Sequence, residues 1–519
     1  MIDIVLSERD FDYELQALVT GFFPGVHNRV LIQPEQEDAA LFELAERESG
    51  DGISLLTGVF LGQYEIRGWV LGKGHLHRNS VSVSGGQDFH KHVDKTTHPY
   101  RTSYKNKLKK LLFELYSSIP EEELPEGIQR SIPVWGTMTG VRPTKIPMNR
   151  LLEGEPLEQV RRSMEEEYCC SGGKAELCLD IAVREAKLLQ KAEYNKGYSL
   201  YIGIPFCPST CLYCSFPSYP LERFQALIPD YLEALKKEIR FCAGLQRGKR
   251  LTSVYIGGGT PTTLSAGQME ELLQCLYESF PVNEAAEITV EAGRPDSITR
   301  EKLMVLRKFG VERISVNPQT MQDKTLQSIG RHHTVEQTKE VFALARECGF
   351  ENINMDLIIG LPGETPEDFE NTLEQIRKLD PDSITIHSLV VKRASRLRRL
   401  LDEGAVPEEE KMMEMGLTFA AENGYQPYYM YRQKNTAGYA GSSGQENIGF
   451  AREGKECLYN ILIMEEMQSI AALGAGASTK CYDRQRHIVS RVENVKSVTD
   501  YISRIDEMLQ RKQEHGMGD

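Results

Sequence analysis

Hydrophobic and polar positions follow one repeating unit through the middle of the chain. Each unit has a short run of β-branched or aromatic residues, a turn, and then a segment with apolar residues at helical spacing. The runs are 199–206, 253–256, 287–291, 313–316, 353–359 and 383–387. The helical segments between them are 231–241, 268–277, 299–309, 335–348 and 366–379. Strands that alternate with helices predict a parallel sheet, which either closes into a partial or full barrel or stays open and doubly wound.

The residues on either side of the repeat follow other patterns. Short strand-like runs, helical segments and a turn-rich stretch precede it, at 28–32, 64–71, 103–117, 133–147 and 175–191. A helical segment, an aromatic strand, a Gly/Ser-rich loop and a final helix follow it, at 408–423, 427–432, 437–444 and 498–511. We therefore expect three parts. They are an N-terminal α+β domain of unknown role (1–190), the βα core (195–395) and a mixed α/β C-terminal extension that completes the substrate side (396–519).

The composition and charge are those of a globular protein without the excess of basic residues typical of nucleic-acid-binding proteins. Of the 519 residues, 40% are hydrophobic and 26% are charged, and the net charge of −14 gives no reason to expect a nucleic acid as partner. No apolar stretch approaches the ~18 residues of a membrane span. The acidic N-terminus lacks the basic start and apolar core of a secretory signal. We expect a cytoplasmic protein without membrane insertion, in which thiols stay reduced.

Three of the 11 cysteines fall within eight residues. Cys207, Cys211 and Cys214 lie after the first strand, whereas the single cysteines in helical segments are typical of small buried side chains. This spacing favours a metal site. Zinc, the alternative, would need a fourth ligand, usually from a second Cys/His pair, and no such pair follows nearby. Three thiolates without a fourth indicate an iron–sulfur cluster with one iron open to a small molecule.

Glycines and polar residues follow the later strands of the repeat. The segment GGGTPT (257–262) comes directly after the second strand, where glycines let a ligand approach the backbone; a tight turn is the alternative. Glu291, Gln319, Asp356 and His387 stand near the carboxyl ends of the strands after it. Binding residues of βα barrels gather at that end, so we expect a ligand site beside the cysteines.

These motifs carry a resemblance to a known family. YIGIPFCPSTCLYC (201–214) followed by GGGTPT resembles the radical S-adenosylmethionine (SAM) superfamily, and in detail its oxygen-independent coproporphyrinogen III oxidase family. Further matches are EA-x-x-P at Glu291, S-x-x-x-Q ending at Gln319, Gly330 with Arg331, and DLIIGLPG from Asp356. A longer branch in Gram-positive bacteria, of coproporphyrinogen dehydrogenase type, is similar over the whole length, including WGTMTGVRPTK (135–145), and a haem chaperone forms a sister branch. The resemblance implies a partial (β/α)6 barrel, a [4Fe-4S] cluster and one or possibly two SAM molecules.

The resemblance also implies roles for individual residues. The cluster ligands would be Cys207, Cys211 and Cys214. The contacts of the cluster-bound SAM would be Tyr201, the backbone of Tyr213, Gly258 and Glu291. The surroundings of the nucleosides, including that of a second SAM, would be Gly259, Thr260, Gln319, Arg331, Asp356 and Val390. A reduced donor such as flavodoxin or ferredoxin would supply the electron.

The substrate of that family, coproporphyrinogen III, is a tetrapyrrole with several carboxylates. Cations follow the sixth strand, and Lys392, Arg393 and Arg396 are our candidates for binding its propionates; a solvated helix start is the alternative. The aromatic run Tyr428, Tyr429 and Tyr431 with Arg432 could flank a tetrapyrrole, and one packed face of a strand is the alternative.

Three departures from the family pattern keep alternatives open. The oxidase has a further Cys where this chain has Phe216, and the chaperone has His-Asn-x-x-Tyr-Trp where this chain reads Tyr459-Asn460. Gly293-Arg294 before Pro295 makes one turn longer by a residue than in the family. The resemblance favours an enzyme that decarboxylates coproporphyrinogen III to protoporphyrinogen IX. The alternatives are a haem-binding or haem-trafficking protein that keeps the cluster, and a radical SAM enzyme acting on another tetrapyrrole.

Overall fold

The chain folds into two compact units in the computed structural model. It describes residues 1–32, 55–62, 65–83, 98–214, 217–389, 408–433, 446–484, 486 and 488–515. The units divide between Leu179 and Asp180, and the described part of the extension after residue 396 belongs to the same unit as the βα core. Among the described residues, no helix is both long and apolar enough to cross a membrane.

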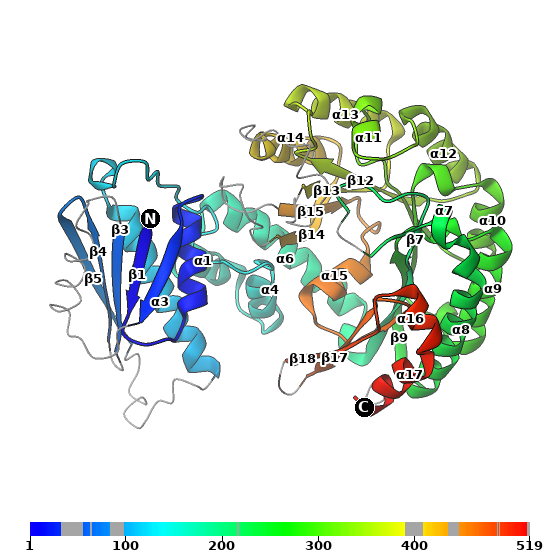
Figure 1. Ribbon diagram of the computed structural model, residues 1–519, viewed down its shortest axis with the longest axis horizontal. Coiled ribbons are helices and arrows are strands. Elements are labelled where there is room, and N and C mark those ends of the chain that lie inside the picture. Colours follow the sequence, from blue (N-terminus) through cyan, green and yellow to red (C-terminus); the bar gives the residue numbers. More distant parts are fainter. Residues whose placement is uncertain are drawn as a thin grey trace. The chain divides into compact units, whose positions relative to one another are not determined.

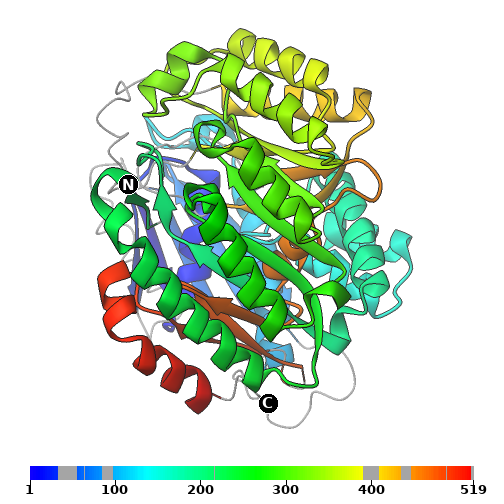
Figure 2. The same ribbon diagram turned by 90° about the vertical axis from the view of Figure 1, so that its right-hand side faces the viewer.

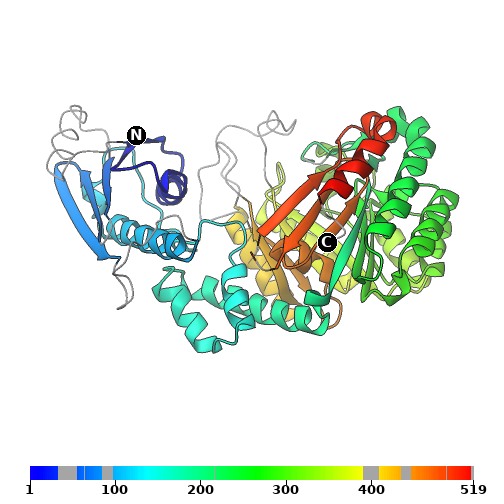
Figure 3. The same ribbon diagram turned by 90° about the horizontal axis from the view of Figure 1, so that it is seen from below.

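A five-stranded sheet forms the centre of the first unit. Its order is β2-β1-β3-β4-β5, in which β1 is parallel to β2 and β3 while β3, β4 and β5 are antiparallel. The strands are β1 (Ile2–Leu6), β2 (Asn28–Ile32), β3 (Leu55–Leu61), β4 (Glu65–Gly72) and β5 (His75–Ser82). Helices α1 (Asp12–Phe22) and α3 (His98–Ser118) share one apolar core with the sheet, and α3 runs along β4 and β5 (Figures 1 and 3). The α+β character expected for this unit is confirmed.

The turn-rich stretch predicted at 133–147 packs within the first unit. Trp135 is buried, and the Lys174 ammonium lies 5.7 Å from the centre of its ring. Gly136 has a φ of 54°, and a Cβ there would lie 2.0 Å from the Tyr168 carbonyl oxygen, so the position requires glycine. The helices that follow are α4 (Lys145–Leu152), α5 (Leu157–Glu166) and α6 (Gly172–Lys191).

The second unit is built on a curved sheet with a parallel centre. The six strands predicted from the repeat are confirmed as parallel neighbours: β6 (Gly197–Ile204), β9 (Arg250–Gly258), β10 (Glu287–Gly293), β11 (Arg313–Val316), β12 (Asn352–Ile359) and β13 (Ser383–Ser388). The helices between them are α7 (Leu221–Phe224), α8 (Ile228–Leu245), α9 (Ala266–Ser279), α10 (Arg300–Lys308), α11 (Asp323–Ser328), α12 (Val335–Glu347) and α13 (Pro366–Leu379). They cover the outer face of the sheet (Figures 1 and 2). This is the partial (β/α)6 barrel that the resemblance implied.

The C-terminal extension widens this sheet at both edges. The order is β14-β15-β13-β12-β11-β10-β9-β6-β16-β17-β18, in which β15 is antiparallel to β13 and β16 is parallel to β6. The added strands are β14 (Gln426–Arg432), β15 (Glu446–Ala451), β16 (Ile470–Leu473), β17 (Ser478–Asp483) and β18 (Ile488–Glu493). The added helices are α14 (Glu409–Glu422), α15 (Leu458–Glu465), α16 (Val498–Ser503) and α17 (Ile505–Glu514). Strand β6, which the three clustered cysteines follow, therefore lies inside the sheet, between β9 and β16.

A buried ion pair fastens the last helix to the barrel. The Lys512 ammonium lies 3.1 Å from the Glu238 carboxylate of α8, and both side chains are fully buried. The same carboxylate accepts hydrogen bonds from the Tyr501 hydroxyl at 2.6 Å and the Asn494 amide at 2.8 Å. The single final helix expected at 498–511 is wrong, because the chain breaks at Arg504. In a continuous helix Tyr501 and Lys512 would stand about 16 Å apart, so the break lets both reach one carboxylate.

Replacing Lys512 with Met should destabilise the protein strongly. The change leaves the Glu238 carboxylate buried without its cation, and we expect the free energy of unfolding to fall by about 3–5 kcal/mol in urea denaturation of the full chain. Lys237→Met is the matched control, since Lys237 pairs with Asp506 between the same two helices but in solvent. Its loss should stay below about 1 kcal/mol. Equal losses in the two variants would contradict a special role for the buried pair.

Helix α15 closes the amino ends of the strands. Glu287, the first residue of β10, accepts hydrogen bonds from the backbone N–H groups of Leu458 at 2.5 Å and Tyr459 at 3.2 Å. These donors have no partner within their own helix, and a carboxylate at a helix start also complements the helix dipole. The contact orders α15 against the sheet at the end opposite to the cysteines.

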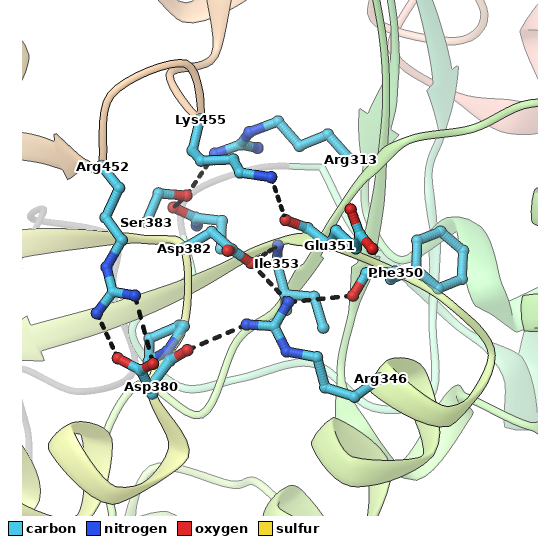
Figure 4. Close-up of polar contacts among 12 residues, drawn as sticks. Arg313, Arg346, Phe350, Glu351, Ile353, Asp380, Asp382, Ser383, Arg452 and Lys455 are labelled. Carbon is cyan, nitrogen blue, oxygen red and sulfur yellow. Dashed lines mark hydrogen bonds and ion pairs between the residues drawn. The ribbon is translucent and has the colours of Figure 1, made fainter.

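Ion pairs hold the neighbouring amino ends of β12 and β13. Figure 4 shows the Arg346 guanidinium on Asp382 (2.7 Å), Arg452 on Asp380, and the Lys455 ammonium on the Glu351 carbonyl oxygen (2.6 Å). Two of these cations come from the extension, which therefore supports the barrel at its amino end. That the extension also completes the substrate side stays a prediction.

Candidate functional site

The three clustered cysteines lie on one loop at the carboxyl end of β6. Cys207 ends the short strand β7 (Phe206–Cys207), which pairs with β8 (Tyr219–Pro220). All three are free thiols and partly exposed. Burial raises the pKa of Cys207 to about 11, and the Cys214 and Cys211 thiols add to the rise. The structure thus brings the three thiols together at a partly open surface.

The glycine segment after β9 holds the start of the cysteine loop. The backbone N–H groups of Gly259 and Thr260 donate to the carbonyl oxygens of Ile204 (2.8 Å) and Phe206 (2.7 Å). A Cβ on Gly259 would lie 2.6 Å from the Phe206 oxygen, so only glycine permits this approach. The Thr260 hydroxyl donates to the Cys207 sulfur at 3.7 Å. The segment is therefore a support for the first cysteine as well as a turn.

The end of β11 and the helix after it hold the other half of the loop. The Leu212 N–H donates to the Ile329 carbonyl oxygen at 3.0 Å. Arg331 is buried, and its guanidinium donates to the Asn317 carbonyl oxygen at 2.6 Å. Its guanidinium also lies near the side chains of Tyr213 and Cys211, two residues of the cysteine loop. Arg331, which the resemblance implied beside a nucleoside, faces the cysteine loop here.

Glu291 and Gly258 meet at the same edge of the barrel. The Glu291 carboxylate accepts hydrogen bonds from the Tyr255 hydroxyl at 2.5 Å and the Gly258 N–H at 3.2 Å. Burial raises the pKa of Glu291 to about 7, although these two hydrogen bonds oppose the rise. Gly258 is exposed, and a Cβ there would lie 3.0 Å from the Tyr201 hydroxyl. Tyr201, Gly258 and Glu291 are thus brought together.

Three tyrosine rings stack in the barrel interior beneath this group. The ring centres of Tyr255 and Tyr459 of α15 are 4.5 Å apart, and the Tyr201 ring lies 6.3 Å from the first and 6.2 Å from the second, so the three rings pack around one another. Neither Tyr255 nor Tyr459 is among the site residues expected from the sequence. A signal was present, because YIG occurs in both β6 and β9, at 201–203 and 255–257. The two strands pair with Tyr201 opposite Tyr255.

Gln319 and Asp356 form a second polar group on the next strands. The Gln319 N–H donates to the Asp356 carbonyl oxygen at 3.0 Å, and Gln319 has a φ of 71°, which is uncommon outside glycine. Its side-chain oxygen is buried and has no hydrogen-bond partner within the described part of the chain. The Asp356 carboxylate accepts from the Asn354 amide at 2.7 Å and lies 3.9 Å from the His387 ring. A strained residue with an unpaired buried acceptor indicates a place for a ligand donor.

Several predicted site residues lie outside the described residues: Val390, Lys392, Arg393, Arg396 and Phe216. Tyr428 and Tyr429 are described, and both are buried.

The donor set fits a [4Fe-4S] cluster. Each thiolate of such a cluster binds a different iron, so the sulfurs spread around the cluster instead of converging on one ion. In the described ranges, no three His, Cys, Asp or Glu side chains converge in the manner of a single-ion site. A cluster with three protein thiolates leaves one iron open to a further ligand. At the same end of the barrel, Gly258 offers exposed backbone and Glu291 offers a carboxylate to such a ligand.

The chain is similar to several known proteins. The Radical SAM superfamily model matches residues 201–376. The oxygen-independent coproporphyrinogen-III oxidase-like protein HemZ of Bacillus subtilis is 41% identical over 73% of this chain and 76% of its own length. The heme chaperone HemW of the same organism is 34% identical over 54% of this chain and 70% of its own. The solved coproporphyrinogen III oxidase HemN of Escherichia coli, a radical SAM enzyme, matches 63% of this chain and 73% of its own at 26% identity, with a TM-score of 0.50.

The fold and the site define a radical SAM protein. Within that superfamily, the chain belongs to the oxygen-independent coproporphyrinogen III oxidase family. Its cofactors are those of the superfamily, a [4Fe-4S] cluster and SAM.

Replacing Gly259 with Ala should loosen the cysteine loop. The new Cβ would meet the Phe206 carbonyl oxygen, so we expect the purified variant to hold less than half the iron and sulfide per chain of the parent after anaerobic reconstitution. Gly267→Ala is the matched control, because Gly267 lies in α9 with open space around its Cα. A parent-like iron content in the Gly259 variant would show that the close approach is dispensable.

Proposed function

We propose that this chain catalyses the oxygen-independent oxidative decarboxylation of coproporphyrinogen III. Two propionates would each lose a hydrogen atom, carbon dioxide and one electron, the electron passing to a one-electron acceptor, and become vinyl groups, giving protoporphyrinogen IX of the haem pathway. The observation that carries the proposal is the gathering of three clustered thiols beside Gly258 and Glu291 in a chain of this family. Relatives named for this reaction, and the solved oxidase among them, support it.

Cys207, Cys211 and Cys214 hold the cluster in this proposal. When bound, the cluster and SAM supply a one-electron cleavage that removes a hydrogen atom from a substrate carbon. The Thr260 hydroxyl on the Cys207 sulfur and the Arg331 side chain at Cys211 fix two of the ligands. The electron comes from a reduced protein such as flavodoxin or ferredoxin, as the resemblance implies.

The rim residues bind SAM by charge and by backbone approach. Glu291, already held by Tyr255, would accept a hydrogen bond from the amino group of SAM, and Gly258, Tyr201 and the Tyr213 backbone would line the same place. The nucleoside-binding residues carried over from the family are Gly259, Thr260, Gln319, Arg331, Asp356 and Val390. Gln319 and Asp356 fit that role, since a buried acceptor and a carboxylate can pair with amino and hydroxyl groups. The tyrosine stack fills the barrel beneath and keeps water out.

The tetrapyrrole carboxylates pair with Lys392, Arg393 and Arg396 in this proposal, because forked guanidinium groups suit carboxylates. A second candidate is haem handling without decarboxylation. The similarity to a heme chaperone over 70% of that protein's length favours it.

An anaerobic assay tests the two candidates together. The full chain is reconstituted with iron and sulfide, the cluster is confirmed by its spectrum, and reductant, SAM and coproporphyrinogen III are added. We expect protoporphyrinogen IX and 5′-deoxyadenosine, both lost in Cys211→Ala and both kept in Cys275→Ala, whose cysteine is buried in α9. SAM cleavage with untouched coproporphyrinogen would refute the decarboxylase proposal. A Soret band on titration with hemin would then support the haem-handling candidate.

SAM affinity should depend on pH through Glu291. With a pKa of about 7, this carboxyl is mostly ionised at pH 8 and mostly protonated at pH 6, and only the ionised form attracts the SAM ammonium. We expect the dissociation constant of SAM to rise roughly tenfold from pH 8 to pH 6, measured by equilibrium binding to the reconstituted chain. Glu291→Gln should flatten this dependence, and Glu284→Gln, at an exposed position, should keep it. The same slope in the Glu291 variant would assign the titration to another group.

A further inference from the structure

The turn after Glu291 is one residue longer than the family pattern, and the structure shows where that residue goes. The pairing of β10 with β11 shifts register between Val290 and Gly293, which is a β-bulge, and Gly293 takes a φ of 67°. A bulge absorbs an extra residue, bends the strand and redirects the next side chain. Glu291 keeps its hydrogen bonds to Tyr255 and Gly258. The side chain redirected by the bulge is Arg294.

Arg294 reaches beneath the cysteine loop and hydrogen-bonds to its middle. One guanidinium nitrogen donates to both the carbonyl oxygen (3.1 Å) and the hydroxyl oxygen (2.7 Å) of Ser209, which lies between Cys207 and Cys211. The Ser209 hydroxyl in turn donates to the Gly330 carbonyl oxygen at 3.3 Å. Arg294 therefore holds the stretch between the first two thiols against the barrel.

The same guanidinium forms a nearly buried ion pair with Asp296. Two parallel hydrogen bonds, of 3.0 Å and 2.6 Å, join the two groups, and the Arg294 side chain is only 4% exposed. Arg331 is a second buried guanidinium at this loop, through Cys211. Burial lowers the pKa of His333 to about 3, which keeps that neighbour uncharged. The cysteine loop thus rests on two fixed positive charges, one of which is balanced by a carboxylate.

We propose that Arg294 is a positioning residue of the cluster, which holds the loop through Ser209 and, together with Asp296, sets the cluster's reduction potential. The proposal rests on Cys207 and Cys211 being cluster ligands. Reduction adds an electron to a cluster that three thiolates already make anionic. A nearby positive charge favours the reduced state and a negative charge opposes it, and both effects are strong where solvent is excluded.

Opposite substitutions in the ion pair separate charge from simple disruption. Each variant of the full chain is reconstituted anaerobically, its iron content is measured, and the midpoint potential of the cluster is read from the electron paramagnetic resonance signal during a redox titration. Asp296→Asn leaves Arg294 unbalanced and should raise the potential. Arg294→Gln leaves Asp296 unbalanced and should lower it. Arg294→Lys keeps the positive charge, so its cluster should have a potential near that of the parent. It loses the guanidinium that bonds both Asp296 and Ser209, so it should release iron to a chelator several-fold faster.

The matched control is Arg300→Gln, which removes an exposed arginine of α10 and should leave potential and iron release unchanged. Shifts of the same sign in Asp296→Asn and Arg294→Gln, or no shift in either, would overturn the proposal. If Arg294→Gln does not fold, the Asp296→Asn and Arg294→Lys results still decide it. A parent chain that assembles no cluster would refute the proposed cluster assignment itself, which the iron content reveals before any titration.

Discussion

The close approach of Gly259 to the Phe206 carbonyl oxygen is the contact on which the site depends. Strands β6 and β9 pair in register, with Ile204 opposite Gly258, so the two loops leave the sheet side by side. The next two N–H groups of the glycine segment then bind the cysteine loop, and Thr260 reaches the Cys207 sulfur. The position of the first thiol is therefore set by the neighbouring strand as much as by its own loop. Any side chain at Gly259 would separate the two loops.

The end of the chain supports the same strand from its other side. Strand β16 pairs in parallel with β6, and Gly474 just after it packs so closely that a Cβ would lie 2.6 Å from the Gly203 carbonyl oxygen. The Gly474 N–H donates to Glu238, the carboxylate that also holds Lys512. Burying that ion pair costs desolvation energy, which its hydrogen bonds offset only if every partner is in place. The C-terminal helices are thereby tied to the strand that leads into the cysteine loop.

Much of the second unit could be predicted from the sequence because its signals are local. Six buried parallel strands alternate with amphipathic helices, and the spacing of three cysteines needs no tertiary information. Strands β1 and β3 escaped prediction because almost every residue in them is buried, so no polar alternation marks them, and they lie outside the strand–helix repeat that marks the buried strands of the barrel. Strand β16 has only four residues, and its place beside β6 depends on a contact across more than 200 positions. Neither burial on both faces of a sheet nor pairing with a distant strand produces a regular alternation of hydrophobic and polar residues in the sequence.

The residues that contact the site residues could not be predicted from the sequence either. The motifs named Glu291 and Arg331, but not that Tyr255 would hold the first or that the second would face Cys211. Arg294 is the most instructive case. In the sequence it belongs to a turn one residue longer than the family pattern, whereas in the structure the register shift between β10 and β11 takes up that residue and Glu291 hydrogen-bonds to Gly258. The longer turn therefore leaves the Glu291 carboxylate beside Gly258 and places the buried charge of Arg294 under the cysteine loop. Members of a family that share the same thiols can in this way differ in how readily the cluster accepts an electron, without any change in its ligands.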